Sequence, residues 1–320
     1  MTHLQSVPIS NIVIGSNVFG WTLDKAASYK ILDALFEKVL RTFDTANIYS
    51  RWVPGNQGGE SERIIGQWSQ ERNNRDQLTI ITKVGMEVED GQGLAGDYIL
   101  KACDNSLRRL QTEYIDVYLS HCEDQSTPIA DTLEAYQQLL DAQKVRVIGG
   151  SNYSFEGLQT MAEVAKSRGL TPYQVYQPEY NLYARSDFEH QYQSFCQQHN
   201  IDVIPYFALA SGFLTGKYRD KSDASQSQRG EGVVNKYLNP RGERILKALD
   251  TVSEDTGAPL AAIALAWLMR QPTIAAPIAS VTKPAHIEAL EAALTLNLSN
   301  EHCSVLDQAS RYADSDTASQ

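Results

Sequence analysis

The feature that most constrains this 320-residue chain is a regular alternation of short and long apolar segments. Short runs rich in β-branched residues predict strands, and the longer amphipathic runs between them predict helices. Such alternation indicates parallel strands joined by helical crossovers. Eight strand–helix units favour a closed (β/α)8 TIM barrel, although an open doubly wound sheet would alternate in the same way. The predicted strands are Ile12–Ile14, Thr42–Asp44, Thr79–Lys83, Asp116–Ser120, Val145–Gly149, Gln174–Gln177, Asp202–Tyr206 and Ile274–Ile278.

The segments between these strands have a helical period. In the second of them, Ile64, Ile65 and Trp68 fall on one helix face. The predicted helices are Lys25–Leu40, Glu60–Glu71, Asp97–Leu110, Ile129–Ala142, Phe155–Ser167, Asp187–His199, Gly242–Glu254, Pro259–Arg270 and Pro284–Ala293.

Three segments lie outside this alternation. Residues 1–10 predict a short N-terminal hairpin or plug before the first strand. Residues 219–240 are polar and rich in Gly and Ser, which is typical of a long mobile loop. The tail over residues 312–320 is expected to be disordered. Because no second strand–helix series flanks them, we interpret residues 1–320 as a single barrel domain.

Composition excludes several classes of protein. With 28 Lys and Arg against 39 Asp and Glu, the net charge of −11 disfavours sequence-independent binding to nucleic acid and a polybasic membrane anchor. No apolar run approaches the length of a transmembrane helix, and the N-terminus lacks a secretory signal pattern. The four cysteines form no CxxC motif, and the six histidines form no HxH or HExxH motif. We therefore expect a cytoplasmic protein with reduced thiols and no metal.

Polar side chains recur at the carboxyl ends of the predicted strands. In a barrel these ends open on one face, where binding and catalytic groups are placed. Nearly every end has a group that titrates or donates a hydrogen bond, so the sequence predicts a functional site on this face. The residues are Asp44, Lys83, Ser120, His121, Ser151, Asn152, Gln177, Tyr206 and Ser280, with Tyr49 five positions after Asp44.

Six motifs around these strand ends resemble the aldo-keto reductases in sequence and in order. The motifs are FDTANIY (43–49), ITKVG (81–85), YLSHCED (118–124), VIGGSNYS (147–154), YQPEYN (176–181) and IPYFALASGFLTGKY (204–218). The resemblance covers about residues 8–310. It implies a (β/α)8 barrel that binds NAD(P)H without a Rossmann fold and reduces aldehydes and ketones.

The residues also suggest the chemistry. Hydride reduction of a carbonyl leaves negative charge on oxygen, so it needs a proton donor and a polarising group. Asp44, Tyr49, Lys83 and His121 match the catalytic tetrad of the family. Tyr49 would donate the proton, and the Lys83 ammonium would favour its phenolate and lower its pKa. Asp44 would orient Lys83, and His121 would donate to the carbonyl oxygen. Alternatively, Asp44 and Lys83 form only a buried ion pair.

The resemblance also implies a set of cofactor contacts. Ser151, Asn152 and Gln177 would bind the nicotinamide carboxamide, and Tyr206 would stack on the ring. The residues expected to hold the pyrophosphate are Ser211–Leu214, which include Gly212, and Lys217, and further expected cofactor contacts are Phe207 and Leu209. The residues expected to hold the adenosine ribose and, in NADP(H), its 2′-phosphate are Ser280, Thr282, Lys283 and His286.

The choice between the two nicotinamide cofactors depends on few residues. Lys283 offers a positive charge to a 2′-phosphate, so we expect NADP(H), with NAD(H) as the alternative. The family usually has a Glu–Asn pair near adenine, where this chain has Ala289 and Leu290.

The substrate pocket is the least defined part of the sequence. The substrate is expected to be a small-molecule carbonyl compound. Trp21 and Trp52 would wall an apolar pocket, or Trp52 packs on the barrel rim instead. No motif specifies the physiological substrate or the oligomeric state.

Parts of the sequence also fit two other functions, and one motif resembles that of a different fold. A Schiff-base aldolase would use Lys83 as its nucleophile, and a non-enzymatic regulatory subunit would bind the cofactor without turnover. The segment GQGLAG (91–96) matches the GxGxxG fingerprint of a Rossmann fold, but it begins eight positions after Lys83 rather than directly on the strand. We interpret it as a flexible loop near the site.

Overall fold

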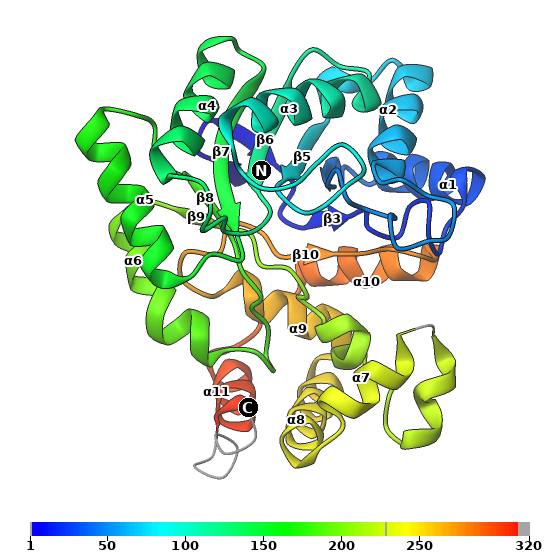
Figure 1. The fold of residues 1–320 in the computed structure, drawn as a ribbon. Coiled ribbons are helices and arrows are strands. Elements are labelled where there is room, and N and C mark those ends of the chain that lie inside the picture. The colour runs from blue at the N-terminus through cyan, green and yellow to red at the C-terminus, as the bar shows by residue number, and fades with distance from the viewer. Residues whose placement is uncertain (1, 228, 313–320) are drawn as a thin grey trace.

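The centre of the fold is an eight-stranded parallel sheet (Figure 1). The computed structural model describes residues 2–227 and 229–312. The strand order is β10-β3-β4-β5-β6-β7-β8-β9, so strands adjacent in sequence are adjacent in space. The strands are β3 (Val13–Gly15), β4 (Thr42–Asp44), β5 (Thr79–Val84), β6 (Ile115–Ser120), β7 (Val145–Ser151), β8 (Val175–Gln177), β9 (Asp202–Val203) and β10 (Ile278–Ala279).

The two edges of this sheet meet, which closes the barrel. The Val203 amide of β9 donates to Thr273 O at 3.1 Å, and the Ala275 amide donates back to Val203 O at 2.8 Å. Further along, the Ile278 amide of β10 donates to Pro205 O at 2.9 Å. The predicted (β/α)8 barrel is therefore confirmed over the open sheet.

The last two strands are shorter than or displaced from their predicted positions. The predicted strand Asp202–Tyr206 ends at Val203, and the predicted strand Ile274–Ile278 begins only at Ile278. Pro205 and Pro277 lack an amide proton, so each interrupts the regular ladder at these positions.

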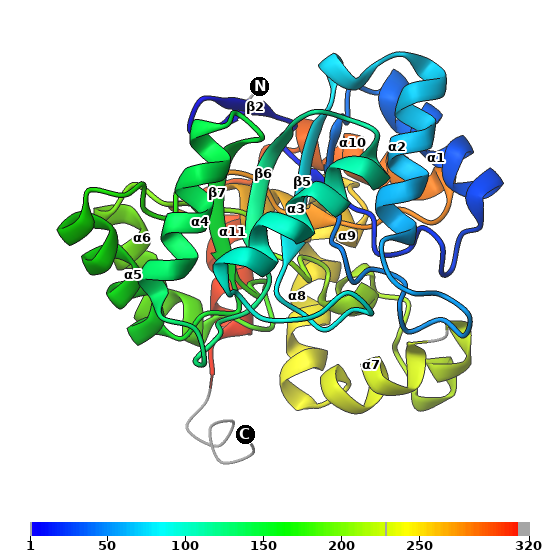
Figure 2. The same ribbon diagram turned by 45° about the horizontal axis from the view of Figure 1, so that its top comes forward.

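The N-terminal hairpin predicted for residues 1–10 is confirmed. β1 (Thr2–Leu4) pairs antiparallel with β2 (Val7–Ile9), and Figure 2 shows it at the end of the barrel opposite α7. Leu4, Val7 and Ile9 are buried against the side chains that fill the barrel interior. The hairpin therefore shields the amino-terminal end of the barrel core.

Helices surround the barrel, and their apolar faces pack on the strands (Figure 1). Several begin at a side chain that accepts an amide hydrogen bond: Asp24, Ser154, Asn239 and Ser299 cap α1, α5, α8 and α11. The helices are α1 (Lys25–Glu37), α2 (Glu60–Arg72), α3 (Gly96–Leu110), α4 (Ile129–Asp141), α5 (Phe155–Arg168), α6 (Gln193–Gln198), α7 (Gly230–Tyr237), α8 (Pro240–Thr256), α9 (Leu260–Met269), α10 (Pro284–Thr295) and α11 (Asn300–Ser310), and shorter turns are η1 (Arg75–Gln77), η2 (Phe188–Tyr192), η3 (Ala210–Thr215) and η4 (Lys221–Gln226). None of the described helices is long and apolar enough to cross a membrane.

One glycine sets the distance between neighbouring helices. A Cβ added to Gly66 in α2 would lie 2.4 Å from the backbone oxygen of Arg109 in α3. Only glycine therefore allows α2 and α3 to approach this closely without a backbone shift.

The prediction of a long loop over residues 219–240 was wrong. The segment folds into η4 and α7, and α7 lies beside α8 in both views (Figures 1 and 2). Asp220 caps η4, and α7 buries Val233, Val234 and Tyr237 on one face. These two elements could not be recognised in the polar sequence because they are short and only one of them has an apolar face.

The C-terminal end also differs from expectation. The helix α11 was not predicted. Tyr312, which was placed in the disordered tail, donates a hydrogen bond from its hydroxyl to Tyr183 O at 3.0 Å. The rest of the predicted tail, residues 313–320, lies outside the described residues.

Candidate active site

A buried lysine is the centre of the candidate site. Lys83 in β5 has a side chain that is 0% exposed. Its Nζ lies 2.8 Å from both carboxylate oxygens of Asp44, 2.8 Å from Thr45 O and 3.1 Å from Tyr49 Oη. Burial lowers the pKa of Lys83, and the Asp44 carboxylate opposes this effect. Because an ammonium donates three hydrogen bonds, these three partners fully satisfy the charged form.

Tyr49 lies in the turn after β4, beside the carboxylate of Asp44. Its hydroxyl lies 3.3 Å from Asp44 Oδ2, to which it donates. Burial raises the pKa of Tyr49 well above its usual value, and the negative charge of Asp44 raises it further. The net shift is therefore opposite to the lowering expected from Lys83, because burial and the Asp44 carboxylate outweigh that effect. The phenol therefore keeps its proton at neutral pH.

His121 completes the group. It follows β6, and its amide donates to Val84 O at 2.7 Å. The rings of His121 and Tyr49 lie 5.9 Å apart, and burial and the Lys83 charge lower the pKa of His121 well below its usual value. Its Nδ1 is buried and has no hydrogen-bond partner in the described part of the chain. The structure thus brings all four predicted tetrad residues together, with a neutral imidazole.

Two of the predicted nicotinamide contacts are connected to the tetrad. Gln177, at the end of β8, donates from Nε2 to Asp44 Oδ1 at 2.9 Å. Ser151, at the end of β7, donates from Oγ to Gln177 O at 2.7 Å. Both side chains are almost completely buried. Their amide and hydroxyl groups therefore lie in the same polar layer as Asp44.

Asn152 and Tyr206 form a second connected pair. The Tyr206 hydroxyl donates to Asn152 Oδ1 at 2.8 Å, and Asn152 Nδ2 donates to His121 O at 2.9 Å. Asn152 has a left-handed backbone with φ 54°, which a non-glycine residue rarely adopts. This conformation is held by hydrogen bonds next to the tetrad, as is common for residues of functional sites.

The loop after β9 contains further left-handed residues. Phe207 and Ser211 have φ values of 52° and 55°, and Gly212 has a φ of 93°. The Gly212 amide donates to Leu209 O at 2.8 Å, and a Cβ on Gly212 would lie 3.3 Å from Lys217 Nζ. The five cofactor contacts predicted between positions 207 and 217 therefore share one tightly folded loop.

A groove of about 590 Å³ opens beside this loop. It lies between the β9 loop and α7, and Phe207 is 41% exposed there. The residues that line it are Phe207, Ser211, Arg229, Glu231, Gly232, Val233, Asn235, Lys236 and Tyr237.

Arg229 is a site residue that the sequence analysis missed. Its guanidinium carbon lies 4.5 Å from the ring centroid of Trp21, and its charge acts to lower the pKa of Tyr49. It lies in the segment interpreted as a mobile loop, and no motif there marks an arginine that turns toward the tetrad.

Two lysines from the segments predicted to bind the cofactor lie near His286. Lys217 and Lys283 both act to lower the pKa of His286, after the larger effect of desolvation. His286 Nδ1 accepts from the Thr282 amide at 3.3 Å. In the same segment, Ser280 Oγ donates a hydrogen bond to Asn17 Oδ1 at 2.9 Å. The positive charges of two separate loops thus lie close together, as an anion site requires.

Of the two predicted substrate residues, Trp52 lies beside Tyr49 and Trp21 packs on Trp52. Trp21 and Trp52 pack edge to face with centroids 5.5 Å apart, and Trp52 lies 6.2 Å from Tyr49. Trp52 remains 47% exposed. An exposed aromatic side chain therefore borders the ring of Tyr49.

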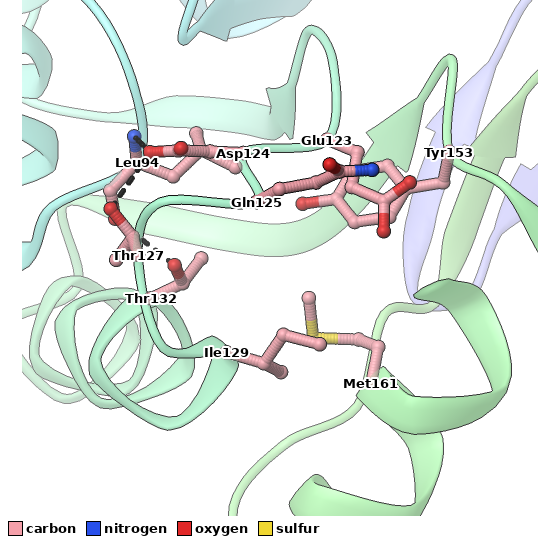
Figure 3. Close-up of a pocket in the computed structure, with 9 residues that line it drawn as sticks. All are labelled: Leu94, Glu123, Asp124, Gln125, Thr127, Ile129, Thr132, Tyr153 and Met161. Atoms are coloured by element: carbon pink, nitrogen blue, oxygen red, sulfur yellow. Dashed lines mark hydrogen bonds between the residues drawn. The ribbon is translucent and has the colours of Figure 1, made fainter. Parts of the chain in front are cut away.

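A second cavity, of about 270 Å³, is lined by none of the four tetrad residues (Figure 3). Asp124 fixes one side of it by accepting from the Leu94 amide and the Thr127 hydroxyl, both at 2.7 Å. Leu94 belongs to the GQGLAG segment, in which Gly91 and Gly93 have positive φ values. These glycines form turns in the loop after β5, and the barrel excludes the Rossmann interpretation. In the described ranges no cluster of three His, Cys, Asp or Glu side chains could hold a metal.

The chain resembles known enzymes over nearly its whole length. The model of the aldo/keto reductase family matches residues 11–311. Aldo-keto reductase YhdN from Bacillus subtilis is 31% identical over 298 residues, covering 90% of this chain and 84% of that protein. An aryl-alcohol dehydrogenase [NADP(+)] from Phanerodontia chrysosporium is 29% identical, covering 95% and 82%.

A relative named for a different role is about as similar. A probable voltage-gated potassium channel subunit beta from Arabidopsis thaliana is 29% identical over 292 residues, covering 89% of this chain and 87% of that protein. The family match and the relatives named as reductases and dehydrogenases agree with the barrel and its strand-end residues. The chain therefore belongs to the aldo/keto reductase family, whose members are oxidoreductases that generally use NAD(P)H.

Proposed function

We propose that this enzyme reduces aldehyde or ketone carbonyls to alcohols with NADPH, and that Tyr49 is the general acid. One observation carries the proposal. Lys83 Nζ contacts Asp44 and Tyr49 at once, in a buried group that also includes His121. A proton donor, a cation behind it and a neutral imidazole beside it are the groups that carbonyl reduction requires.

NADPH, when bound, supplies the hydride. The protein supplies the proton from the neutral Tyr49 phenol. As the proton leaves, Lys83 Nζ donates a hydrogen bond to the developing phenolate, which stabilises it. Asp44 keeps Lys83 charged and oriented, and the neutral His121 donates a hydrogen bond to the carbonyl oxygen.

The nicotinamide end of NADPH fits the polar layer next to Asp44. Ser151, Asn152 and Gln177 offer donors and acceptors for a carboxamide, and the Tyr206 ring offers a surface for stacking. The left-handed backbone of Asn152 points to a conformation that is maintained for binding.

The other end of NADPH fits the two positively charged loops. The pyrophosphate would be held by Ser211–Leu214, which include Gly212, and by Lys217, with Phe207 and Leu209 as further cofactor contacts. The ribose with its 2′-phosphate would be held by Ser280, Thr282, Lys283 and His286. The proximity of Lys217, Lys283 and His286 supports a doubly charged phosphate more than a bare hydroxyl. Leu290 is buried against the core, so adenine contacts would come from other residues.

The substrate that this site favours is a small carbonyl compound with an apolar or aromatic body. Trp52 offers aromatic surface beside Tyr49, and Trp21 packs against Trp52. The similarity to an aryl-alcohol dehydrogenase supports the same choice.

The alternatives fit less well. A Schiff-base aldolase needs a lysine with a free lone pair, but Lys83 is fully buried and all its donors are engaged. A regulatory subunit would not need an intact tetrad, which this chain has. The four free cysteines support a cytoplasmic location.

The experiment is turnover of a simple aromatic aldehyde with NADPH and with NADH. We expect the alcohol as product, faster consumption of NADPH than of NADH at limiting cofactor, and a rate lower by about 10² or more in Tyr49→Phe. No turnover of any member of an aldehyde and ketone panel, together with tight NADPH binding, would support the regulatory subunit instead.

A further inference from the structure

The two residues that hold Lys83 are adjacent in sequence. Asp44 provides the carboxylate and Thr45 provides the backbone oxygen, each 2.8 Å from Lys83 Nζ. The peptide between them is itself fixed, because Asp44 O accepts from the Ser16 amide at 2.9 Å and the Thr45 amide donates to Ile81 O at 2.8 Å. The position of this dipeptide therefore determines where the lysine ammonium lies.

Three buried hydroxyl groups close a ring behind this dipeptide. Thr45 Oγ1 lies 2.9 Å from Ser61 Oγ in α2, and Ser61 Oγ lies 2.8 Å from Ser16 Oγ at the end of β3. Ser16 Oγ lies 2.7 Å from Asp44 O. The chain of hydrogen bonds thus starts on Thr45 and returns to Asp44. All three hydroxyl residues are 0% exposed, so water does not compete for these bonds.

The protons of the ring can be assigned from its end point. A carbonyl oxygen only accepts, so Ser16 must donate its hydroxyl proton to Asp44 O. Ser61 must then donate to Ser16, either to Oγ or to the backbone oxygen at 2.9 Å. Thr45 donates to Ser61 in turn. Every hydroxyl proton has one acceptor, so loss of any member leaves a buried polar atom without its partner.

We propose that Ser16, Ser61 and the Thr45 hydroxyl are positioning residues that hold the Asp44–Thr45 peptide so that Lys83 stays against Tyr49. None of the three hydroxyls touches the reacting atoms; they act through the dipeptide. The inference rests on the proposed role of Tyr49 as the general acid.

The test compares variants that remove one hydroxyl each. Ser61→Ala removes the middle of the ring, and Thr45→Val removes its start with little change of shape. Thr45→Ser keeps the hydroxyl and serves as the rescue. Ser28→Ala is the matched control, because Ser28 is also 0% exposed on a barrel helix and its hydroxyl donates to Leu23 O at the long distance of 3.5 Å.

Looser placement of Lys83 weakens Tyr49 as an acid, because the phenolate loses part of its hydrogen bond. We expect kcat for aldehyde reduction to fall about 3- to 10-fold in Ser61→Ala and Thr45→Val, the size of one lost hydrogen bond. The KM and the NADPH dissociation constant should change less than about twofold, since the contacts that bind substrate and cofactor in the ground state are retained. Thr45→Ser and Ser28→Ala should keep the kcat of the unmodified enzyme.

The pH profile separates positioning from simple structural support. Reduction needs protonated Tyr49, so kcat falls as pH rises through the pKa of Tyr49 in the complex. A weaker contact with Lys83 raises that pKa, so the alkaline limb should move to higher pH in Ser61→Ala and Thr45→Val. Lower thermal stability with an unchanged kcat and an unchanged limb in both variants would overturn the inference. Full turnover in Tyr49→Phe would instead overturn the proposed function, which keeps the two failures distinct.

Discussion

The ammonium of Lys83 lies 3.1 Å from the phenol oxygen of Tyr49; Lys83 is fully buried and Tyr49 is half-buried. Lys83 is the donor in this contact, and its other donors go to Asp44 and Thr45. The neutral phenol is the ground state, because burial and the Asp44 charge raise its pKa. The contribution of Lys83 is therefore greatest when the proton has left Tyr49.

Tyr49→Phe tests the proton donor. The variant loses the hydroxyl but keeps the ring, so the cofactor loops should be unaffected. We expect carbonyl reduction to fall by about 10² or more, the lower range for general acid catalysis. The measurement is kcat with an aromatic aldehyde, together with the NADPH dissociation constant from tryptophan fluorescence. A variant that keeps most of its kcat would show that another group provides the proton.

Lys283→Ala tests the choice of cofactor. Lys283 lies close enough to His286 to lower its pKa, in the loop proposed to hold the 2′-phosphate. Loss of one charge-assisted hydrogen bond of about 1.5–3 kcal/mol would weaken NADPH binding roughly 10- to 150-fold. NADH binding should hardly change. Dissociation constants for both cofactors at fixed ionic strength provide the comparison, and equal losses would mean that Lys283 supports the loop rather than the phosphate.

Asp124→Asn tests a pH-dependent part of the stability. Partial burial acts to raise the pKa of Asp124, but hydrogen bonds from Ser126, Leu94 and Thr127 outweigh it and hold the pKa well below its usual range. A lowered folded-state pKa stabilises the protein above the unfolded value of about 3.9, and this stabilisation is lost as pH falls through the folded value.

We therefore expect Asp124→Asn to lower the free energy of unfolding by roughly 1 kcal/mol at neutral pH, a modest effect because the carboxylate is partly exposed. The difference in free energy of unfolding between the variant and the unmodified protein should become smaller as the pH falls below about 4. This difference is measured by urea unfolding at a series of pH values. Asp76→Asn, on the exposed turn η1, is the control. A difference that grows on acidification would contradict the assigned direction.

Gly66→Ala tests the contact between α2 and α3. The added Cβ would lie 2.4 Å from Arg109 O, so the helices must shift. We expect a loss of about 1–3 kcal/mol in the free energy of unfolding. The matched control is Gly232→Ala in α7, where an added Cβ meets nothing within 4 Å. There alanine should stabilise by about 0.5–1 kcal/mol. Similar effects at both positions would show that helix propensity, not packing, determines the outcome.

The sequence predicted the parts of this structure that have a strong local signal. The strand Thr42–Asp44 has the predicted bounds, and the hairpin and the tetrad lie where the motifs indicated. The motif residues follow strands, and a barrel brings all strand ends to one face, so their proximity followed from the topology.

Other parts depend on contacts that no local pattern encodes. The helix α7 lies in a polar segment, and its few apolar residues become a face only once they meet neighbouring elements. Arg229 lies just before that helix, so its place beside Trp21 could not be predicted without it. The raised pKa of Tyr49 depends on burial and on the exact distance to Asp44, and neither can be derived from spacing.

The full occupancy of the Lys83 donors makes Asp44, Thr45, Lys83 and Tyr49 one thermodynamic unit. Removing any one partner leaves the others with unmatched charge or unmatched hydrogen bonds in a buried place. Once the first partner is lost, most of the stabilising interactions of the unit are already broken, so a second substitution costs little further free energy. Free-energy costs measured one residue at a time will therefore sum to more than the cost of removing the whole set, and only multiple-mutant cycles can divide the catalytic effect among these side chains.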